Sequence, residues 1–170
     1  RFPDAHPETD SVDGGAAAVY TPGQPVVGAT WDTAHDSPGT EATVSDSNSI
    51  GDTMIRAYSV TDKYDIWRRQ IVVFNNPGLS AGDTITAVTV QWANVSVDND
   101  FGGSVTLDTA APASNTEIVA GDYNSFGGVK QTDTDLVLGS MSTGLNNLNT
   151  ITLNATGRGN TPKGAVSKWM

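Results

Sequence analysis

Short apolar stretches separated by polar, turn-forming residues recur along the whole chain. Residues 66–74 are continuously apolar over their last four positions, which is typical of a central strand covered on both faces. Residues 84–92 end in an alternation that puts Val88, Val90 and Trp92 on one face, as in a half-buried strand. The loop between them is rich in Pro, Gly, Asn and Asp. These two stretches are predicted to be paired strands at the centre of the fold.

Weaker apolar runs predict the rest of the sheet. Residues 98–103 have the composition of a hairpin tip between two of these runs, and residues 156–160 have room for one helical turn at most. The polar stretch 32–52 predicts a long loop. The last run predicts a strand with nothing after it to close the sheet. The runs are residues 16–20, 26–31, 53–60, 95–97, 104–107, 118–120, 136–138, 150–154 and 165–170.

Composition supports the same fold class. The 170 residues include 18 Gly and 8 Pro, helix formers are scarce, and Thr, Ser, Asn and Val are abundant. We therefore predict an all-β, antiparallel β-sandwich of jelly-roll type. Residues 1–15 contain two prolines and little to bury, and they are predicted to be an extended arm or linker. Residues 16–170 are predicted to form one β-sandwich domain, whose last strands are either absent or supplied by a neighbouring subunit.

Charge narrows the classes of partner. Nineteen acidic residues against nine basic ones give a formal net charge of −10, which repels phosphate backbones and anionic membranes. We therefore expect no nucleic-acid partner and no membrane insertion, and no apolar run of 18 or more residues is present. The chain has no cysteine, which suits phage particles and prokaryotic surfaces as well as cytosol and does not decide the compartment.

Several motifs match a known group of proteins. An example is Arg-Arg-Gln-Ile-Val-Val-Phe at residues 68–74. The chain resembles uncharacterised proteins of tailed phages, prophages and environmental sequences, similar to the β-sandwich modules called DNRLRE domains. The matching residues are 3–9, 11–14, 30–31, 68–74, 80–87, 112–116, 119–123, 153–157 and 164–168.

The resemblance implies a jelly-roll-like sandwich that serves as a structural or adhesive module. Group members carry Asp and Thr where this chain has Asn75-Asn76-Pro77, and they continue for further strands beyond the position of Met170. The missing continuation predicts either a fragment or an open sheet edge that a neighbouring subunit fills.

Catalytic constellations are poorly represented. Only His6 and His35 could act as histidine bases, and no Gly-x-Ser-x-Gly elbow occurs. His35 is followed by Asp36 and Ser37, but adjacent side chains are expected to point apart, so a solvated loop histidine is the simpler interpretation. The three glutamates, Glu8, Glu41 and Glu117, are all predicted to lie in loops. We therefore predict no enzyme and no catalytic residues.

Calcium is the strongest candidate for a cofactor. Asp98, Asn99 and Asp100 supply hard oxygen ligands at the predicted hairpin tip, and glycines follow them. Asp133 and Asp135 form a second pair. Neither segment has the terminal Glu of a twelve-residue calcium loop, and Asp and Asn also simply form good turns. No other cofactor is predicted. A transition-metal site at His6, with acidic neighbours in the arm, is a weaker alternative.

Aromatic residues offer a possible sugar contact. Trp67 and Trp92 lie in strong strand patterns and are expected in the core or an interface. Tyr64 and Tyr123 stand beside turn residues and Asp, so they are expected to be the exposed aromatics. Asn94 and Asn154 begin glycosylation sequons, which are expected by chance in a chain of this composition.

These observations lead to a functional hypothesis. The chain is expected to be a non-enzymatic structural or adhesive subunit of an extracellular assembly, most simply a phage virion or tail-associated protein. Its partners would be copies of itself, other virion or surface proteins, and host-surface glycan. The alternative is a carbohydrate-binding module of a secreted surface protein or enzyme.

Overall fold

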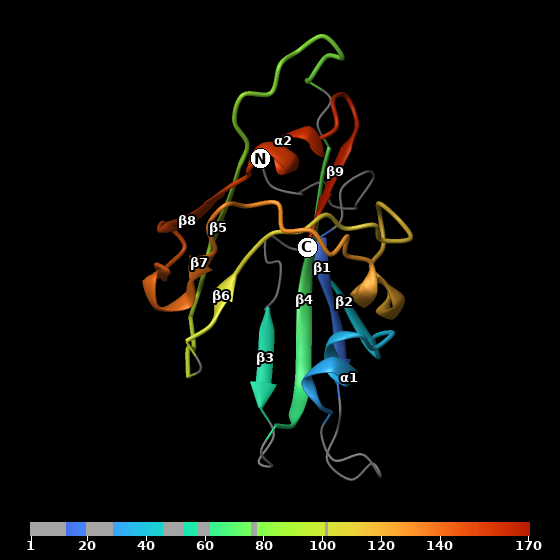
Figure 1. The fold of residues 1–170 in the computed structure, drawn as a ribbon, viewed down its shortest axis with the longest axis vertical. Helices are drawn as coiled ribbons and strands as arrows, with labels where there is room; N and C mark the ends of the chain where they lie inside the picture. The colour runs from blue at the N-terminus through green and yellow to red at the C-terminus, as the bar shows by residue number, and fades with distance from the viewer. Residues whose placement is uncertain (1–12, 20–28, 46–52, 58–61, 76–77, 101) are drawn as a thin grey trace.

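The fold is built almost entirely from short antiparallel strands (Figure 1). The computed structural model describes residues 13–19, 29–45, 53–57, 62–75, 78–100 and 102–170. The all-β, antiparallel prediction is confirmed, and the strand pairings among these residues close no barrel. The elements are β1 (Asp13–Val19), α1 (Trp31–His35), β2 (Glu41–Ser45), β3 (Met54–Ala57), β4 (Tyr64–Asn75), β5 (Thr89–Ala93), β6 (Ser104–Val105), η1 (Ala120–Asn124), β7 (Leu136–Val137), η2 (Leu138–Ser140), β8 (Leu148–Thr152), α2 (Ala155–Gly159) and β9 (Val166–Trp169).

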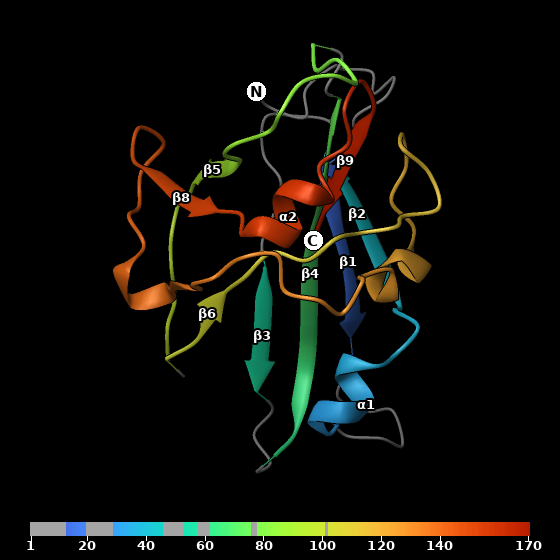
Figure 2. The same cartoon turned by 45° about the horizontal axis from the view of Figure 1, so that its top comes forward.

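The main sheet is organised around the long strand β4. Its strand order is β2-β1-β4-β3, and β9 also pairs with β4. β1 runs along one edge of β4, while β3 and β9 share the other edge, since they pair with residues 64–68 and 72–75 respectively. Two smaller ribbons, β5 with β8 and β6 with β7, lie to one side of β4 (Figure 2).

Small residues on β1 make room for large ones on β4. Gly14, Ala16 and Ala18 lie opposite Ile71, Arg69 and Trp67 in the antiparallel register, so each pair shares one face of the sheet. The short 3-10 helix η1 packs on β1, and its Tyr123 joins Ala16 and Ala18 in one core. The Ala-rich run therefore forms the floor on which bulky side chains of β4 and η1 pack.

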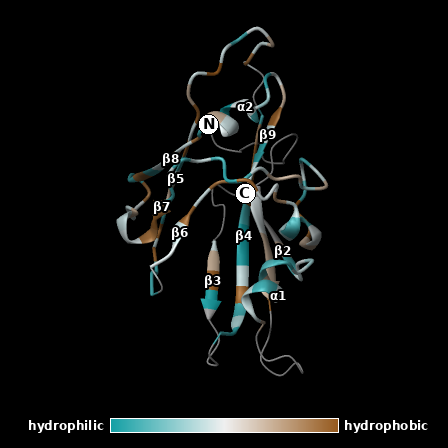
Figure 3. Cartoon of the chain, in the orientation of Figure 1, coloured by the Kyte–Doolittle hydropathy of each residue, from teal (hydrophilic) through white to brown (hydrophobic). Residues whose placement is uncertain are grey.

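β4 contributes to two hydrophobic cores, one on each face. Trp67, Ile71 and Val73 join a core that includes Tyr123, whereas Val72 joins a second core. Figure 3 shows hydrophilic and hydrophobic bands along β4. The prediction that residues 71–74 are covered on both sides is confirmed. The buried members of the second core are Val72, Leu107, Ile151, Leu153 and Trp169.

The predicted central hairpin is wrong. β4 does not pair with β5; β5 pairs with β8, across residues 89–93 and 148–152. The inward face was predicted correctly, because Val88, Val90 and Trp92 all pack on the second core. Alternation fixes which side chains turn inward, but the partner strand is set by the rest of the fold.

The second predicted hairpin also pairs differently. The predicted returning strand 104–107 forms β6 at residues 104–105, and its partner is β7 rather than residues 95–97. Residues 118–120 run into η1 and do not form a strand. In the first half of the chain, the predicted polar loop contains α1 and β2. The single helical turn predicted at residues 156–160 is confirmed as α2.

The strand predicted to leave an open edge has neighbours on both sides. β9 pairs with β4 along one edge. Along the other, Ala110 N donates to Lys168 O at 3.0 Å, and Asp108 and Met170 exchange backbone hydrogen bonds of 2.8 and 3.0 Å. The expectation that this strand awaits a partner is therefore wrong for β9.

The last residues of the predicted arm belong to the main sheet. β1 begins at Asp13, inside the segment 1–15, because Gly14 and Gly15 pair with β2 and β4. The remaining residues 1–12 of the predicted arm lie outside the described residues, as does the weak metal candidate at His6.

Asn154 caps helix α2, and its loss has a predictable cost. Its side-chain oxygen accepts from Gly157 N at 2.8 Å. We expect Asn154→Ala to lower the free energy of unfolding by about 1 kcal/mol, the usual loss for an N-cap. Asn154→Asp keeps the acceptor and should stay near wild type. Urea unfolding would measure both variants, and equal stability of the two would contradict the cap.

Candidate functional site

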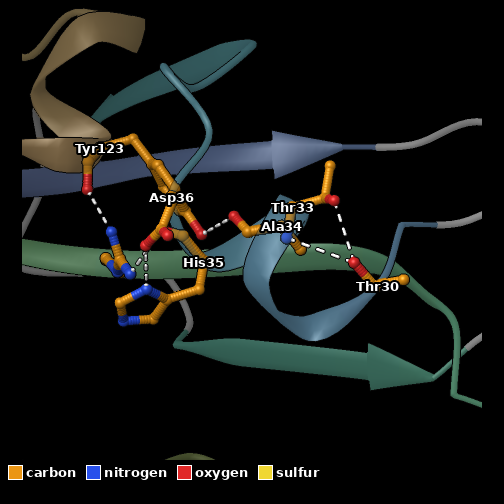
Figure 4. Close-up of polar contacts among 7 residues, drawn as sticks. Thr30, Thr33, Ala34, His35, Asp36 and Tyr123 are labelled. Carbon is orange, nitrogen blue, oxygen red and sulfur yellow. Dashed lines mark hydrogen bonds and ion pairs between the residues drawn. The ribbon is translucent and has the colours of Figure 1, made fainter.

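A polar segment that forms helix α1 brings two rings to the surface. Thr30 starts the helix, because its Oγ1 accepts from Thr33 N at 3.4 Å and lies 2.9 Å from Thr33 Oγ1 (Figure 4). Trp31 and His35 stand four positions apart, so they share one helix face. Ala34 is buried against the sheet. The helix thus holds both rings near the start of β4, where Tyr64 and Trp67 lie.

Five rings meet there and define what we call the aromatic patch: Trp31, His35, Tyr64, Trp67 and Phe126. The Trp31 and His35 rings are within 14° of parallel, with centroids 6.1 Å apart. Both meet Trp67 at steep angles, at centroid distances of 4.0 and 5.6 Å. Tyr64 and Phe126 contact the group from either end, at 5.8 Å from Trp31 and 5.5 Å from His35. Edge-to-face contacts of this kind fix ring orientation.

The patch is exposed at its rim and buried at its base. Trp67 is only 6% exposed, whereas Trp31 is 47% exposed. The His35 side chain is 35% exposed. Ile55 lies opposite Trp67 on β3, on the same face of the sheet, and is exposed as well. A buried tryptophan therefore supports aromatic side chains that solvent can reach.

A β-bulge in β4 places Tyr64 in the patch. Arg56 pairs with Ile66, but the next residue of β3 pairs with Tyr64, so β4 has one extra residue here. An extra residue shifts the alternation of faces by one. Tyr64 can therefore contact Trp67, at 5.9 Å between centroids, although three positions separate them. The buried Asp65 at the bulge binds the Arg56 guanidinium, with an Nε–Oδ1 distance of 2.9 Å.

Arg69 joins the patch to the core. Its guanidinium lies 4.2 Å from the ring centroids of both Tyr123 and Phe126. It donates to Tyr123 O at 2.8 Å and to His35 O, near the end of α1, at 3.0 Å. A guanidinium satisfies helix-terminal carbonyls well because its donors are fixed in a fork. Arg69 therefore ties α1 and η1 to the central strand.

Burial lowers the pKa of the Arg69 guanidinium, while interactions with Tyr123 and Asp36 act in the opposite direction. Arginine nevertheless keeps its charge at any physiological pH. This half-buried cation is thus compensated by ring faces and carbonyl dipoles.

His35 and Asp36 contact each other, contrary to expectation. His35 Nδ1 lies 2.5 Å from Asp36 Oδ1 (Figure 4). The sequence-based prediction that these adjacent side chains point apart is wrong, because the chain turns at the end of α1. Ser37 Oγ accepts instead from Gly39 N at 3.2 Å. The three residues do not form the serine–histidine–aspartate relay of a hydrolase.

The two tyrosines predicted as sugar contacts differ in exposure. Tyr64 lies in the aromatic patch and is half-buried. The expectation that Tyr123 is exposed is wrong: it is fully buried, and its hydroxyl donates to Ala34 O at 2.7 Å. Sequence reasoning missed Trp31 as a surface ring. The signal was Thr30 followed by Asp32, an N-cap and an acidic first turn.

The calcium candidates stay predictions. Asp98 and Asp100 are exposed, and Asn99 Oδ1 accepts from Gly103 N at 3.0 Å, as in an Asn turn. Asp135 Oδ1 lies 2.8 Å from Lys130 Nζ, and this contact lowers the pKa of the Asp135 carboxyl. Within the described residues, no three His, Asp or Glu side chains gather as a metal site.

The remaining sequence candidates have local structural roles or exposed positions. Glu41 begins β2 and was wrongly placed in a loop, while Glu117 is exposed in a connection. Asn94 Oδ1 accepts from Trp92 Nε1 at 3.1 Å, so this sequon asparagine holds a half-buried tryptophan. In the part of the chain that is described, no helix is long and apolar enough to span a membrane.

Comparisons with known proteins add no assignment. No protein-family model matches the chain, and no curated protein and no solved structure matches it significantly. The resemblance to phage β-sandwich proteins therefore stays a prediction, and the function must be argued from the site.

Proposed function

We propose that this chain is a non-enzymatic adhesive module of an extracellular assembly, such as a virion or its tail, that binds carbohydrate through the aromatic patch. The observation that carries the proposal is the patch itself. Trp31 offers a ring at 47% exposure, fixed in orientation by contacts with His35, Tyr64 and Trp67. A preformed apolar surface binds with little ordering cost.

The surroundings of the patch favour a sugar. Pyranose rings present apolar C–H faces and hydroxyl edges, so a matching surface needs aromatic faces with polar groups beside them. Thr30, Asp32 and Asp36 are exposed on or next to α1 and can bond hydroxyl groups. Within the described part of the patch, the aliphatic contribution is small and comes chiefly from Ile55.

The assembly part of the proposal has narrower support. β9 is flanked on both sides, so self-association through it is not expected. In the strand pairings of the described residues, β2 pairs with β1 and β3 pairs with β4, each along one edge. Unpaired strand edges are common sites of association. Light scattering of the purified protein over a range of concentrations tests this part, and a monomer throughout would contradict it.

Removing the exposed ring tests the carbohydrate part. We expect Trp31→Ala to weaken binding to a polysaccharide or glycan array at least about tenfold, since a tenfold loss corresponds to about 1.4 kcal/mol. Tyr64→Ala should cause a smaller loss. Isothermal titration calorimetry on the best array hit would measure both.

A control variant outside the patch shows whether a loss of binding is specific to the aromatic patch. Val95 is 82% exposed and lies outside the patch, so Val95→Ala should bind as wild type does. Unchanged binding by the Trp31 variant, or no glycan bound by the native protein, would contradict the carbohydrate proposal.

A further inference from the structure

Carboxylates dominate the charge around the aromatic patch. Asp32 follows Trp31 in α1, and Asp36 follows His35 at the end of the helix. The Asp36 side chain contacts the His35 ring and is 71% exposed. Asp62 stands in the turn that leads to Tyr64 and is also exposed. The whole chain adds to this field, with a formal net charge of −10. A ligand approaching the rings therefore meets negative potential.

The nearby cations offset this field only in part, because Arg69 and His35 both interact with Asp36 and leave Asp32 and Asp62. Arg69 is enclosed by the rings of Tyr123 and Phe126, and its guanidinium is directed at two backbone carbonyls. Lys63, beside Tyr64, is half-buried and is the one ammonium group adjacent in sequence to the patch. Three exposed carboxylates thus lie near the rings, against one half-buried ammonium group and one half-buried guanidinium.

Ring faces and carboxylates together suit a positively charged sugar. A cation near the face of Trp or Tyr is attracted by the ring quadrupole, and a nearby carboxylate adds to this attraction. A sugar that carries a carboxylate or sulfate is repelled by the same groups. The charge pattern thus distinguishes sugars that have the same shape but carry different charges.

Resting on the proposed carbohydrate function, we infer that the aromatic patch selects glycans by charge: amino sugars bind most tightly, neutral sugars less tightly, and acidic sugars least. Asp32 and Asp36 set this order, while Trp31 supplies the contact that all three classes share. A single exposed charge pair is worth at most about 1 kcal/mol, or roughly fivefold in affinity. Two carboxylates should therefore separate amino from acidic sugars by about tenfold or more.

Three oligosaccharides of equal length test the order: oligoglucosamine, its N-acetylated neutral form, and an oligouronate. Binding is measured by calorimetry at low salt and at a mildly acidic pH at which the amines are protonated. The native protein should bind them in that order, and about 0.5 M salt should reduce the differences, since it shortens the Debye length well below 10 Å.

Charge variants locate the effect. Asp32→Asn with Asp36→Asn should weaken oligoglucosamine binding at least about fivefold and strengthen oligouronate binding. Asp98→Asn with Asp133→Asn removes the same charge near β6 and β7, which lie across β3 and β4 from α1 in both views (Figures 1 and 2). This control pair should keep the native order.

The outcomes separate the two claims. Equal binding of the three oligosaccharides, or the same change in both double variants, would overturn the charge selection and leave carbohydrate binding standing. No binding of any of them, together with an empty glycan array, would overturn both. A reversal of the order would show that another cation, such as Lys63, directs the ligand, and would also refute the role of Asp32 and Asp36.

Discussion

Gly39→Ala is expected to lower the free energy of unfolding by about 3–5 kcal/mol, which combines a left-handed backbone cost with overpacking. Gly39 has φ of +77°, and a Cβ there would lie 2.1 Å from Ala120 O and 2.7 Å from Tyr123 Cβ. Backbone atoms cannot yield as a flexible side chain does. The turn after α1 would have to move away from η1, so the two segments that Arg69 joins would separate.

Two other glycines separate the cost of the left-handed backbone from the cost of overpacking. Gly128 has φ of +73°, but a Cβ there meets nothing within 4 Å, so Gly128→Ala should cost only about 1 kcal/mol of backbone strain. Gly121 lies in η1 beside Ala120 with ordinary φ and open space, and Gly121→Ala should be near neutral. Urea unfolding would measure all three. A Gly39 variant as stable as the Gly128 variant would contradict the close approach.

Arg69→Met is expected to destabilise the protein by about 2–4 kcal/mol, because two carbonyls lose charge-assisted hydrogen bonds and two rings lose a stacked cation. The carbonyls are those of His35 and Tyr123. Arg69→Lys keeps the charge but not the planar fork, so we expect an intermediate loss of about 1–2 kcal/mol. Chemical unfolding would measure these losses.

The Arg69 variants should also change the aromatic patch. Without the bond to His35 O, α1 is held less firmly, so near-ultraviolet circular dichroism from Trp31 should weaken and glycan binding should fall. Arg158 donates to Leu153 O at 3.2 Å and, among the described residues, to no other carbonyl, so it serves as the control. Arg158→Met should cost about 0.5–1 kcal/mol and leave the patch signal unchanged. Equal losses from both arginines would contradict the special role of Arg69.

Local pattern predicted the inward faces of β5 and β8 and the helical turn of α2. Ile151 and Leu153 are buried as their alternation indicated, and the single turn of α2 lies where expected. The same pattern failed for strand partners: β5 was assigned to β4 and pairs with β8. Period-2 alternation reports burial on one face, whereas pairing depends on contacts between residues that are far apart in sequence.

The candidate site could be predicted only in part. Tyr64 was identified as a possible sugar contact, but Tyr123 was chosen beside it and Trp31 was missed. Turn residues flank both tyrosines, so sequence context could not distinguish a ring over Arg69 in the core from a ring at the surface. The β-bulge that turns Tyr64 toward Trp67 has no signature in the residues 64–66 themselves.

The sequence by itself determined the antiparallel all-β character, the acidic charge and the apolar faces of the strands. Gly and Pro frequency and β-branched alternation act locally, so they can be interpreted without knowing the fold. Only the tertiary structure decided that β9 is flanked on both sides, that Tyr123 is buried, and that five rings meet around Trp67. Each of these depends on segments brought together by the packing of β4 against both cores, and long-range packing is not encoded at any single position.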